Sequence, residues 1–170
     1  MTTPTDIAEF IAFWRDSTLK ERSGSQGHFI ALCGLLGIKS PTEADPHGDW
    51  FAFEKGAKKT GGGDGWADVW RRYCFAWEYK GKHQDLAAAL RQLQQYALAL
   101  DNPPLLIVSD MAMIEIHTNF TNTVNVTHRL TVGNPPFLVL FLTLGLIWNG
   151  SMKAQRSGCR WWVLGQPQGR

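Results

Sequence analysis

The chain has 170 residues, of which 44% are hydrophobic and 19% are charged, and its formal net charge is +2. This length fits one domain with a sizeable core, and the composition excludes an intrinsically disordered chain. The three cysteines form no Cys-x-x-Cys pair, so no zinc site is indicated. The N-terminus lacks the basic and then apolar run of a secretory signal, which predicts a cytoplasmic location.

Two helices are expected at the start of the chain. The first covers residues 5–15, with Thr5 as its N-cap and an apolar stripe at helical spacing. The second runs over residues 17–36 and ends at the glycine that follows. We then expect a loop over residues 41–48 and a short strand over residues 50–54.

Residues 55–65 are rich in glycine and lysine. They lack the Gly-x-x-x-x-Gly-Lys-Ser/Thr pattern, so a nucleotide-binding P-loop is not supported. From Lys55 to Lys82, seven Lys and Arg residues accompany three acidic ones, which is a local charge of +4. Such a field suits a polyanion. We therefore expect a mobile basic loop that brings Lys55, Lys58 and Lys59 to DNA, with a solvated lysine-rich loop as the alternative.

Two carboxylates and a lysine follow at a spacing typical of metal-dependent phosphodiester cleavage. Asp68 is separated by nine residues from Glu78-Tyr79-Lys80. Carboxylates bind a hard cation through oxygen. Side chains two apart on a strand share a face, so Glu78 and Lys80 would lie in one site. If the two β-rich runs here form a hairpin centred on Tyr73, Asp68 lies opposite Glu78. The same spacing is also common among solvated surface charges.

Three tryptophans flank these acidic residues, and we expect them to pack in the core and the sheet instead of stacking on bases: Trp66, Trp70 and Trp77. A helix over residues 84–100 follows, and then strands over residues 105–109 and 113–117. The order is α-α-β-β-β-α-β-β. It predicts an α/β fold in which helices flank a mixed central sheet.

The character of the sequence changes near residue 132. We expect one domain over residues 1–131 and an atypical tail over residues 132–170. The apolar run at residues 135–148 is too short to span a bilayer, so no membrane partner is expected.

The motifs follow one another in an order that resembles the PD-(D/E)xK nuclease superfamily: a helix with Glu21, a hairpin with Asp68 and Glu78-x-Lys80, and a helix with Gln92 and Tyr96. The Gln-x-x-x-Tyr element looks like the helix motif of the RecB-like branch. Its two side chains are neighbours on one helix face. A polar helix edge is the other interpretation of this pair.

Several blocks within residues 4–131 resemble the N-terminal domain of MmeI-like restriction–modification enzymes: Phe53-Glu54-Lys55-Gly56, Gly65-Trp66-Ala67-Asp68-Val69-Trp70 and Phe75-Ala76-Trp77-Glu78-Tyr79-Lys80. In that family a nuclease is fused to a DNA adenine methyltransferase in one chain. The resemblance implies Mg²⁺-dependent cleavage of double-stranded DNA. The implied metal ligands are Asp68, Glu78 and the backbone carbonyl of Tyr79. Lys80 would lie beside the nucleophilic water, and Glu21 would assist from its helix.

By the same resemblance, Lys82, Gln92 and Tyr96 are expected to position the DNA. Family enzymes are several times longer, and this chain carries no glycine motif for S-adenosylmethionine, so we expect neither cofactor binding nor methylation. The segment Gly133-Asn134-Pro135-Pro136-Phe137 resembles the base-holding motif of adenine methyltransferases. We therefore expect the tail to be a remnant of that motif or a frameshifted segment. A non-catalytic DNA-binding fragment and an inactive remnant are the alternatives to an active endonuclease. The sequence does not indicate an oligomeric state.

Overall fold

The computed structural model describes residues 6–17, 21–82 and 84–131, without the side chains of residues 16 and 21–23. The tail expected at residues 132–170 lies outside the described residues. The elements in chain order are α1 (Ile7–Asp16), α2 (Glu21–Leu35), α3 (Pro41–Ala44), β1 (Phe51–Lys58), β2 (Asp64–Arg71), β3 (Phe75–Tyr79), α4 (Leu86–Tyr96), the 3₁₀ helix η1 (Ala97–Leu100), β4 (Leu105–Ser109), β5 (Met113–Thr118) and β6 (Thr127–Thr131).

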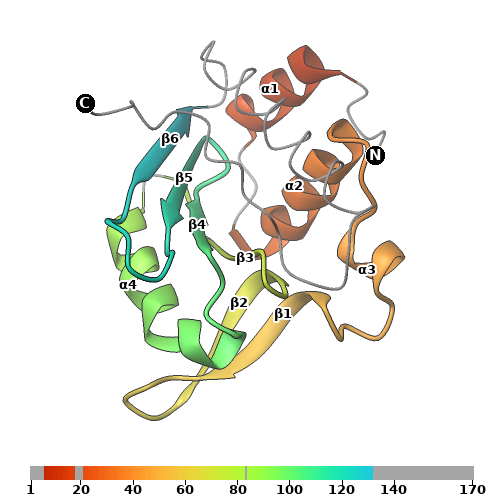
Figure 1. Cartoon of the computed structure of the whole chain (residues 1–170). Helices are drawn as coiled ribbons and strands as arrows, with labels where there is room; N and C mark the ends of the chain where they lie inside the picture. The colour runs from red at the N-terminus through yellow and green to blue at the C-terminus, as the bar shows by residue number, and fades with distance from the viewer. Residues whose placement is uncertain (1–5, 18–20, 83, 132–170) are drawn as a thin grey trace, which may run out of the picture.

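The six strands form one mixed sheet in the order β1-β2-β3-β4-β5-β6. Neighbouring strands are antiparallel except β3 and β4, which are parallel. A parallel pair needs a crossover connection, and α4 supplies it between these two strands. Figure 1 shows α1 and α2 on one side of the sheet and α4 on the other. The structure confirms the predicted α/β fold with a mixed sheet between helices.

The sheet has a hydrophobic cluster on each face. On the α2 side, Phe29 is fully buried, and its ring lies 6.2 Å from that of Phe75 and 5.3 Å from that of Trp77. On the α4 side, Leu93 and Trp70 are buried, and the Trp70 indole N–H donates to the carbonyl of Leu100 at 3.0 Å. The central strand β3 is therefore covered on both faces, which holds its backbone in place for the residues at its end.

The helix N-termini differ from the sequence prediction. Asp6, and not Thr5, is the N-cap of α1, because its carboxylate accepts a 2.8 Å hydrogen bond from the Glu9 N–H. Thr5 itself lies outside the described residues. Helix α2 begins at Glu21 instead of residue 17, since Ser17 is the extended C-cap of α1.

Two elements were missed by sequence analysis. The expected loop at residues 41–48 begins with α3, a single turn that a capping box between Ser40 and Glu43 stabilises. Strand β6 was also missed, because only Leu130 among its five residues is buried and the apolar alternation of a strand is absent. Within the described residues, no helix is both long and apolar enough to cross a membrane.

The largest correction concerns the glycine- and lysine-rich segment. The strand predicted over residues 50–54 continues to Lys58, and β2 begins at Asp64. Most of the expected mobile loop is thus a paired β-ribbon, and the connection between its strands is only residues 59–63. In place of a flexible loop, this region is a hairpin that extends from the sheet (Figure 1).

Candidate active site

Strands β2 and β3 form the hairpin expected from the spacing of the acidic residues. Val69 pairs with Trp77 and Arg71 pairs with Phe75, so the turn is centred on Tyr73. Tyr73 has a φ of 59°, the left-handed conformation that closes such a turn. This register, extended by one pair, sets residue 68 opposite residue 78.

Asp68 is tied to the strand that carries Glu78. Its Oδ2 atom accepts a 2.6 Å hydrogen bond from the backbone N–H of Tyr79. The side chain of Asp68 thus takes the place of a backbone acceptor at the point where the β2–β3 ladder ends. This bond fixes the Asp68 carboxylate next to the backbone of the Glu78-Tyr79-Lys80 segment.

The Glu78 carboxylate is buried, and three side chains donate hydrogen bonds to it. Lys80 Nζ and Gln92 Nε2 lie 2.9 Å and 2.8 Å from Oε1, and the Tyr96 hydroxyl lies 2.9 Å from Oε2. Burial raises the pKa of the Tyr96 hydroxyl, and the negative charge of Glu78 raises it further. Tyr96 therefore remains a hydrogen-bond donor to Glu78 throughout the physiological pH range.

The pair on α4 has a different place from the one expected. We predicted that Gln92 and Tyr96 contact DNA, but both side chains point to Glu78, and Tyr96 is fully buried. Their spacing of four residues puts them on one helix face, and that face lies on the sheet. In the structure both side chains hydrogen-bond the Glu78 carboxylate, which sequence alone could not distinguish from DNA contact.

Strand β2 changes faces at Asp68. Ala67 packs in the cluster under α4, whereas Val69 packs in the cluster under α2. Residues two positions apart share a face in a regular strand, so these two should lie on the same side. Phe53 pairs with Val69 and Lys55 pairs with Ala67, but Asp68 and Glu54, which lie between these pairs, are not paired in the ladder. Glu54 has a φ of 50°. The carboxylates of Asp68 and Glu54 therefore lie at a break in the pairing of β1 with β2.

A small hollow opens at this break, lined by Ser25, Gln26, Phe53, Glu54, Asp68 and Val69. Gln26 Nε2 donates to Glu54 Oε1 at 3.3 Å, which links α2 to β1 at the rim of the hollow. Sequence analysis did not single out Glu54 or Gln26 as site residues. The only available signal was the position of Glu54 in one of the blocks that resemble the MmeI-like family. The predicted contribution of Glu21 lies outside the described side chains.

The four lysines predicted to contact DNA are used differently. Lys55 Nζ donates to the carbonyl of Gly48 at 3.0 Å and lies 4.7 Å from the centroid of the Trp70 ring. Lys82 Nζ donates to the carbonyls of Arg15 and Ser17 at the C-terminus of α1. These two ammonium groups link separate parts of the fold, and the DNA contacts predicted for Lys55 and Lys82 stay predictions.

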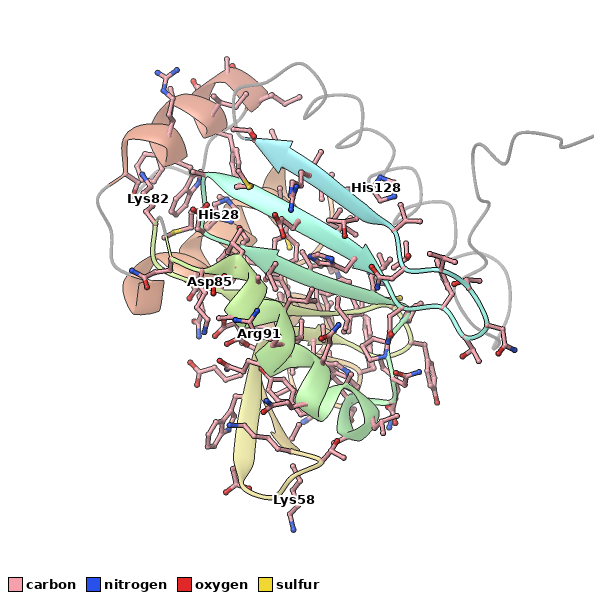
Figure 2. The ribbon with its side chains drawn as sticks, turned by 90° about the vertical axis from the view of Figure 1, so that its left-hand side faces the viewer. His28, Lys58, Lys82, Asp85, Arg91 and His128 are labelled. Atoms are coloured by element: carbon pink, nitrogen blue, oxygen red, sulfur yellow. The ribbon has the colours of Figure 1, made fainter. Side chains whose placement is uncertain are left out.

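The remaining two lysines lie at the distal end of the ribbon. Lys58 is exposed, and Figure 2 shows its side chain pointing away from the body of the protein. Lys59 is half-buried and is the first residue of the connection between β1 and β2. The DNA contacts predicted for Lys58 and Lys59 remain predictions.

The side chain of Tyr79 lies on the face of β3 opposite to Glu78. Its hydroxyl is 2.8 Å from Nδ1 of His28 on α2, and both side chains are fully buried. Burial lowers the pKa of His28 to about 3 and raises that of Tyr79 well above its usual value, so both groups are neutral. The alternation of β3 expected from sequence is thus present, with Glu78 on one face and Tyr79 on the other.

The carboxylate oxygens at this site are ligands that suit a hard cation such as Mg²⁺. Among the described residues, no group of three or more His, Cys, Asp and Glu side chains is placed to hold a metal ion. However, Mg²⁺ uses one or two carboxylates and fills its remaining positions with water and substrate phosphate oxygens. Asp68 and Glu78 would supply that donor set. A direct bond from Glu78 to a metal would require one of its three hydrogen-bond donors to move.

No protein-family model matches the chain, and no curated protein matches it. A cryo-EM structure of a DrdV–DNA complex contains a similar chain, with 17% identical residues and a TM-score of 0.46. The matched region covers 81% of this chain and 13% of that chain. This chain therefore spans a small part of the length of the protein that it matches.

We expect Gly65→Ala to destabilise the protein. A Cβ atom at Gly65 would lie 2.8 Å from Cδ1 and 3.0 Å from Cε1 of the Tyr96 ring. Because this ring is fully buried, overpacking should lower the free energy of unfolding by about 1–3 kcal/mol. Thermal denaturation measures the effect. Gly61→Ala is the matched control, since its Cβ would meet nothing within 4 Å. Equal melting temperatures for the two variants would contradict the close Gly65–Tyr96 contact.

Proposed function

We propose that residues 6–131 form the nuclease part of a restriction-type enzyme and hydrolyse phosphodiester bonds in double-stranded DNA with Mg²⁺. The observation that carries this proposal is the environment of Glu78, a buried carboxylate held by Lys80, Gln92 and Tyr96 beside Asp68. Burying a carboxylate carries a desolvation penalty that its hydrogen bonds and a nearby lysine often only offset, so stability alone does not explain this arrangement. The MmeI-like sequence blocks around the same residues support the assignment.

Mg²⁺ would be held by Asp68, Glu78 and the backbone carbonyl of Tyr79. When bound there, it would supply charge neutralisation at the phosphate and a more acidic bound water. The protein contributes the orientation of both carboxylates: the Tyr79 N–H holds Asp68, while Gln92 and Tyr96 hold Glu78.

Lys80 is the group that would act on the attacking water. Its ammonium lies 2.9 Å from Glu78 Oε1, and its side chain is 22% exposed, so it lies at the boundary between the buried carboxylate and solvent. From this position the Lys80 ammonium can donate a hydrogen bond to a water next to the scissile phosphate. To accept a proton from that water, Lys80 must first lose a proton and become a neutral amine. The two donors on α4 remain on Glu78 when Lys80 turns towards the water.

Supercoiled plasmid incubated with the whole chain tests the proposal. Wild type with Mg²⁺ should nick or linearise the plasmid, and excess EDTA should prevent this. Asp68→Asn keeps an oxygen that can accept from the Tyr79 N–H but removes the charge, so we expect cleavage to fall by at least about 100-fold. DNA retardation without cleavage by wild type would instead support a non-catalytic DNA-binding domain.

A further inference from the structure

The β1–β2 ribbon extends past the rest of the sheet. Residues 55–58 of β1 pair with residues 64–67 of β2, whereas in the described chain β2 pairs with β3 only over residues 69–71. Residues 55–67, which we call the arm, are thus a two-stranded ribbon that projects from the body (Figures 1 and 2).

The arm is braced against the C-terminal end of α4. The backbone N–H and the hydroxyl of Thr60 both donate to the carbonyl of Gln95, at 2.9 Å and 2.8 Å. The Tyr96 hydroxyl lies 2.9 Å from the carbonyl of Trp66. The backbone of Gly65 is in close contact with the Tyr96 ring. The arm is therefore fixed to the same tyrosine that donates to Glu78, so its position relative to the candidate active site is set.

The arm presents an aromatic side chain to solvent. We expected Trp66 to pack in the sheet, but the residue is 56% exposed, and this prediction was wrong. Its indole lies over Gly56 on the paired strand, where a Cβ atom would be 3.4 Å from Nε1. The ring thus covers a glycine while more than half of the residue stays accessible to a ligand.

The charge of the arm favours an anionic partner. Its residues include Lys55, Lys58 and Lys59 against Asp64 alone, which is a net charge of +2. Trp66 precedes Asp68 by two residues, so their Cα atoms are about 7 Å apart along the strand. A ligand that touched the exposed indole would therefore lie close to Asp68 as well. The major groove of B-DNA is wide enough to admit a two-stranded β-ribbon.

We propose that the arm enters the major groove of the DNA substrate, with Lys58 on a backbone phosphate and the exposed ring of Trp66 against base edges and sugars next to the cleaved bond. This inference rests on the proposed nuclease function and extends it to residues outside the acidic site. The bracing by Tyr96 then places the scissile phosphate relative to Glu78, because the arm and the carboxylate share one anchor.

Fluorescence anisotropy with a labelled duplex, in EDTA so that no cleavage occurs, tests the arm. We expect Trp66→Ala to raise the dissociation constant by roughly 5- to 10-fold, as for a buried aromatic contact. Lys58→Ala should weaken binding and reduce the slope of log K against log salt by about 1, because one phosphate contact is lost. Trp66→Phe, which keeps an aromatic ring, should retain most of the affinity.

Two matched controls lie outside the arm. Tyr73, in the β2–β3 turn, is 57% exposed, and Tyr73→Asn preserves a residue that accepts positive φ. Lys39, between α2 and α3, is an exposed cation comparable to Lys58. Both Tyr73→Asn and Lys39→Ala should bind DNA as wild type does.

The outcomes separate this inference from the proposed function. Wild-type affinity in both Trp66→Ala and Lys58→Ala would overturn the role of the arm. In that case, Mg²⁺-dependent cleavage that Asp68→Asn removes would leave the nuclease proposal intact. If wild type bound no duplex at all, the arm proposal would fail together with the idea of a DNA substrate.

Discussion

Replacing Lys80 with alanine is expected to reduce Mg²⁺-dependent DNA cleavage by about 10²- to 10⁴-fold, the usual contribution of a positioned proton-transfer group. Lys80 directly follows strand β3, whereas Gln92 and Tyr96 lie on α4, and the partly exposed side chain of Lys80 can turn to a water. Gln92 and Tyr96 remain on the carboxylate in the variant. The protein should therefore stay folded, with a stability cost of at most about 1–3 kcal/mol.

Initial rates of plasmid nicking, with thermal denaturation of the same samples, measure this prediction. Lys39→Ala is the control for loss of a lysine elsewhere on the surface. Unchanged nicking by folded Lys80→Ala would show that the lysine only neutralises Glu78 and takes no part in the reaction. If Lys80→Ala lost its thermal transition, Lys80→Gln, with a similar length and a remaining donor, would decide the matter. A folded but inactive Lys80→Gln supports the role of the lysine in the reaction, and a folded and active one contradicts it.

His28 should make stability fall as the solution becomes acidic. Burial lowers its pKa from 6.5 to about 3, so between these values the unfolded chain binds a proton that the folded chain does not. The stability contributed by neutral His28 is complete above pH 6.5 and is lost as the pH falls towards 3. The slope is about 1.4 kcal/mol per pH unit, which amounts to roughly 3 kcal/mol between pH 6.5 and pH 4.

Urea unfolding of wild type and His28→Gln at several pH values measures this dependence. Glutamine can still hydrogen-bond the Tyr79 hydroxyl but does not titrate, so its stability should depend less on pH between 6.5 and 4. Carboxylates whose pKa is lowered in the folded state, such as Asp45 and Asp85, contribute equally to both proteins and cancel in the difference. Parallel stability curves for the two proteins would contradict a buried neutral His28.

Tyr96 connects the arm to the candidate active site. Its hydroxyl lies 2.9 Å from Glu78 Oε2 and 2.9 Å from the carbonyl of Trp66. A hydroxyl has one proton to donate, so these two acceptors share it. A displacement of the arm that lengthened the bond to Trp66 would strengthen the bond to Glu78. The carboxylate and the proposed DNA-binding surface are therefore coupled through one side chain.

Sequence alone was sufficient for the local geometry of the acidic site. The period of two along a strand separates Glu78 and Lys80 from Tyr79, and the symmetric spacing about Tyr73 predicted the β2–β3 register. The helical spacing of Leu93 and its neighbours likewise predicted α4. These features depend on contacts within a strand, a turn or a helix, so the residues that determine them are close together in the sequence.

The tertiary structure decided which partner each polar side chain has. Sequence could place Gln92 and Tyr96 on one helix face, but only the packing of α4 on the sheet shows that this face meets Glu78. The ammonium of Lys82 reaches the end of α1, which lies far away in the chain. Trp66 is exposed on the arm, where β2 pairs with β1 and not with β3. A long polar side chain forms hydrogen bonds with the groups that tertiary packing brings next to it. Because these groups are distant in the sequence, the local sequence does not predict them.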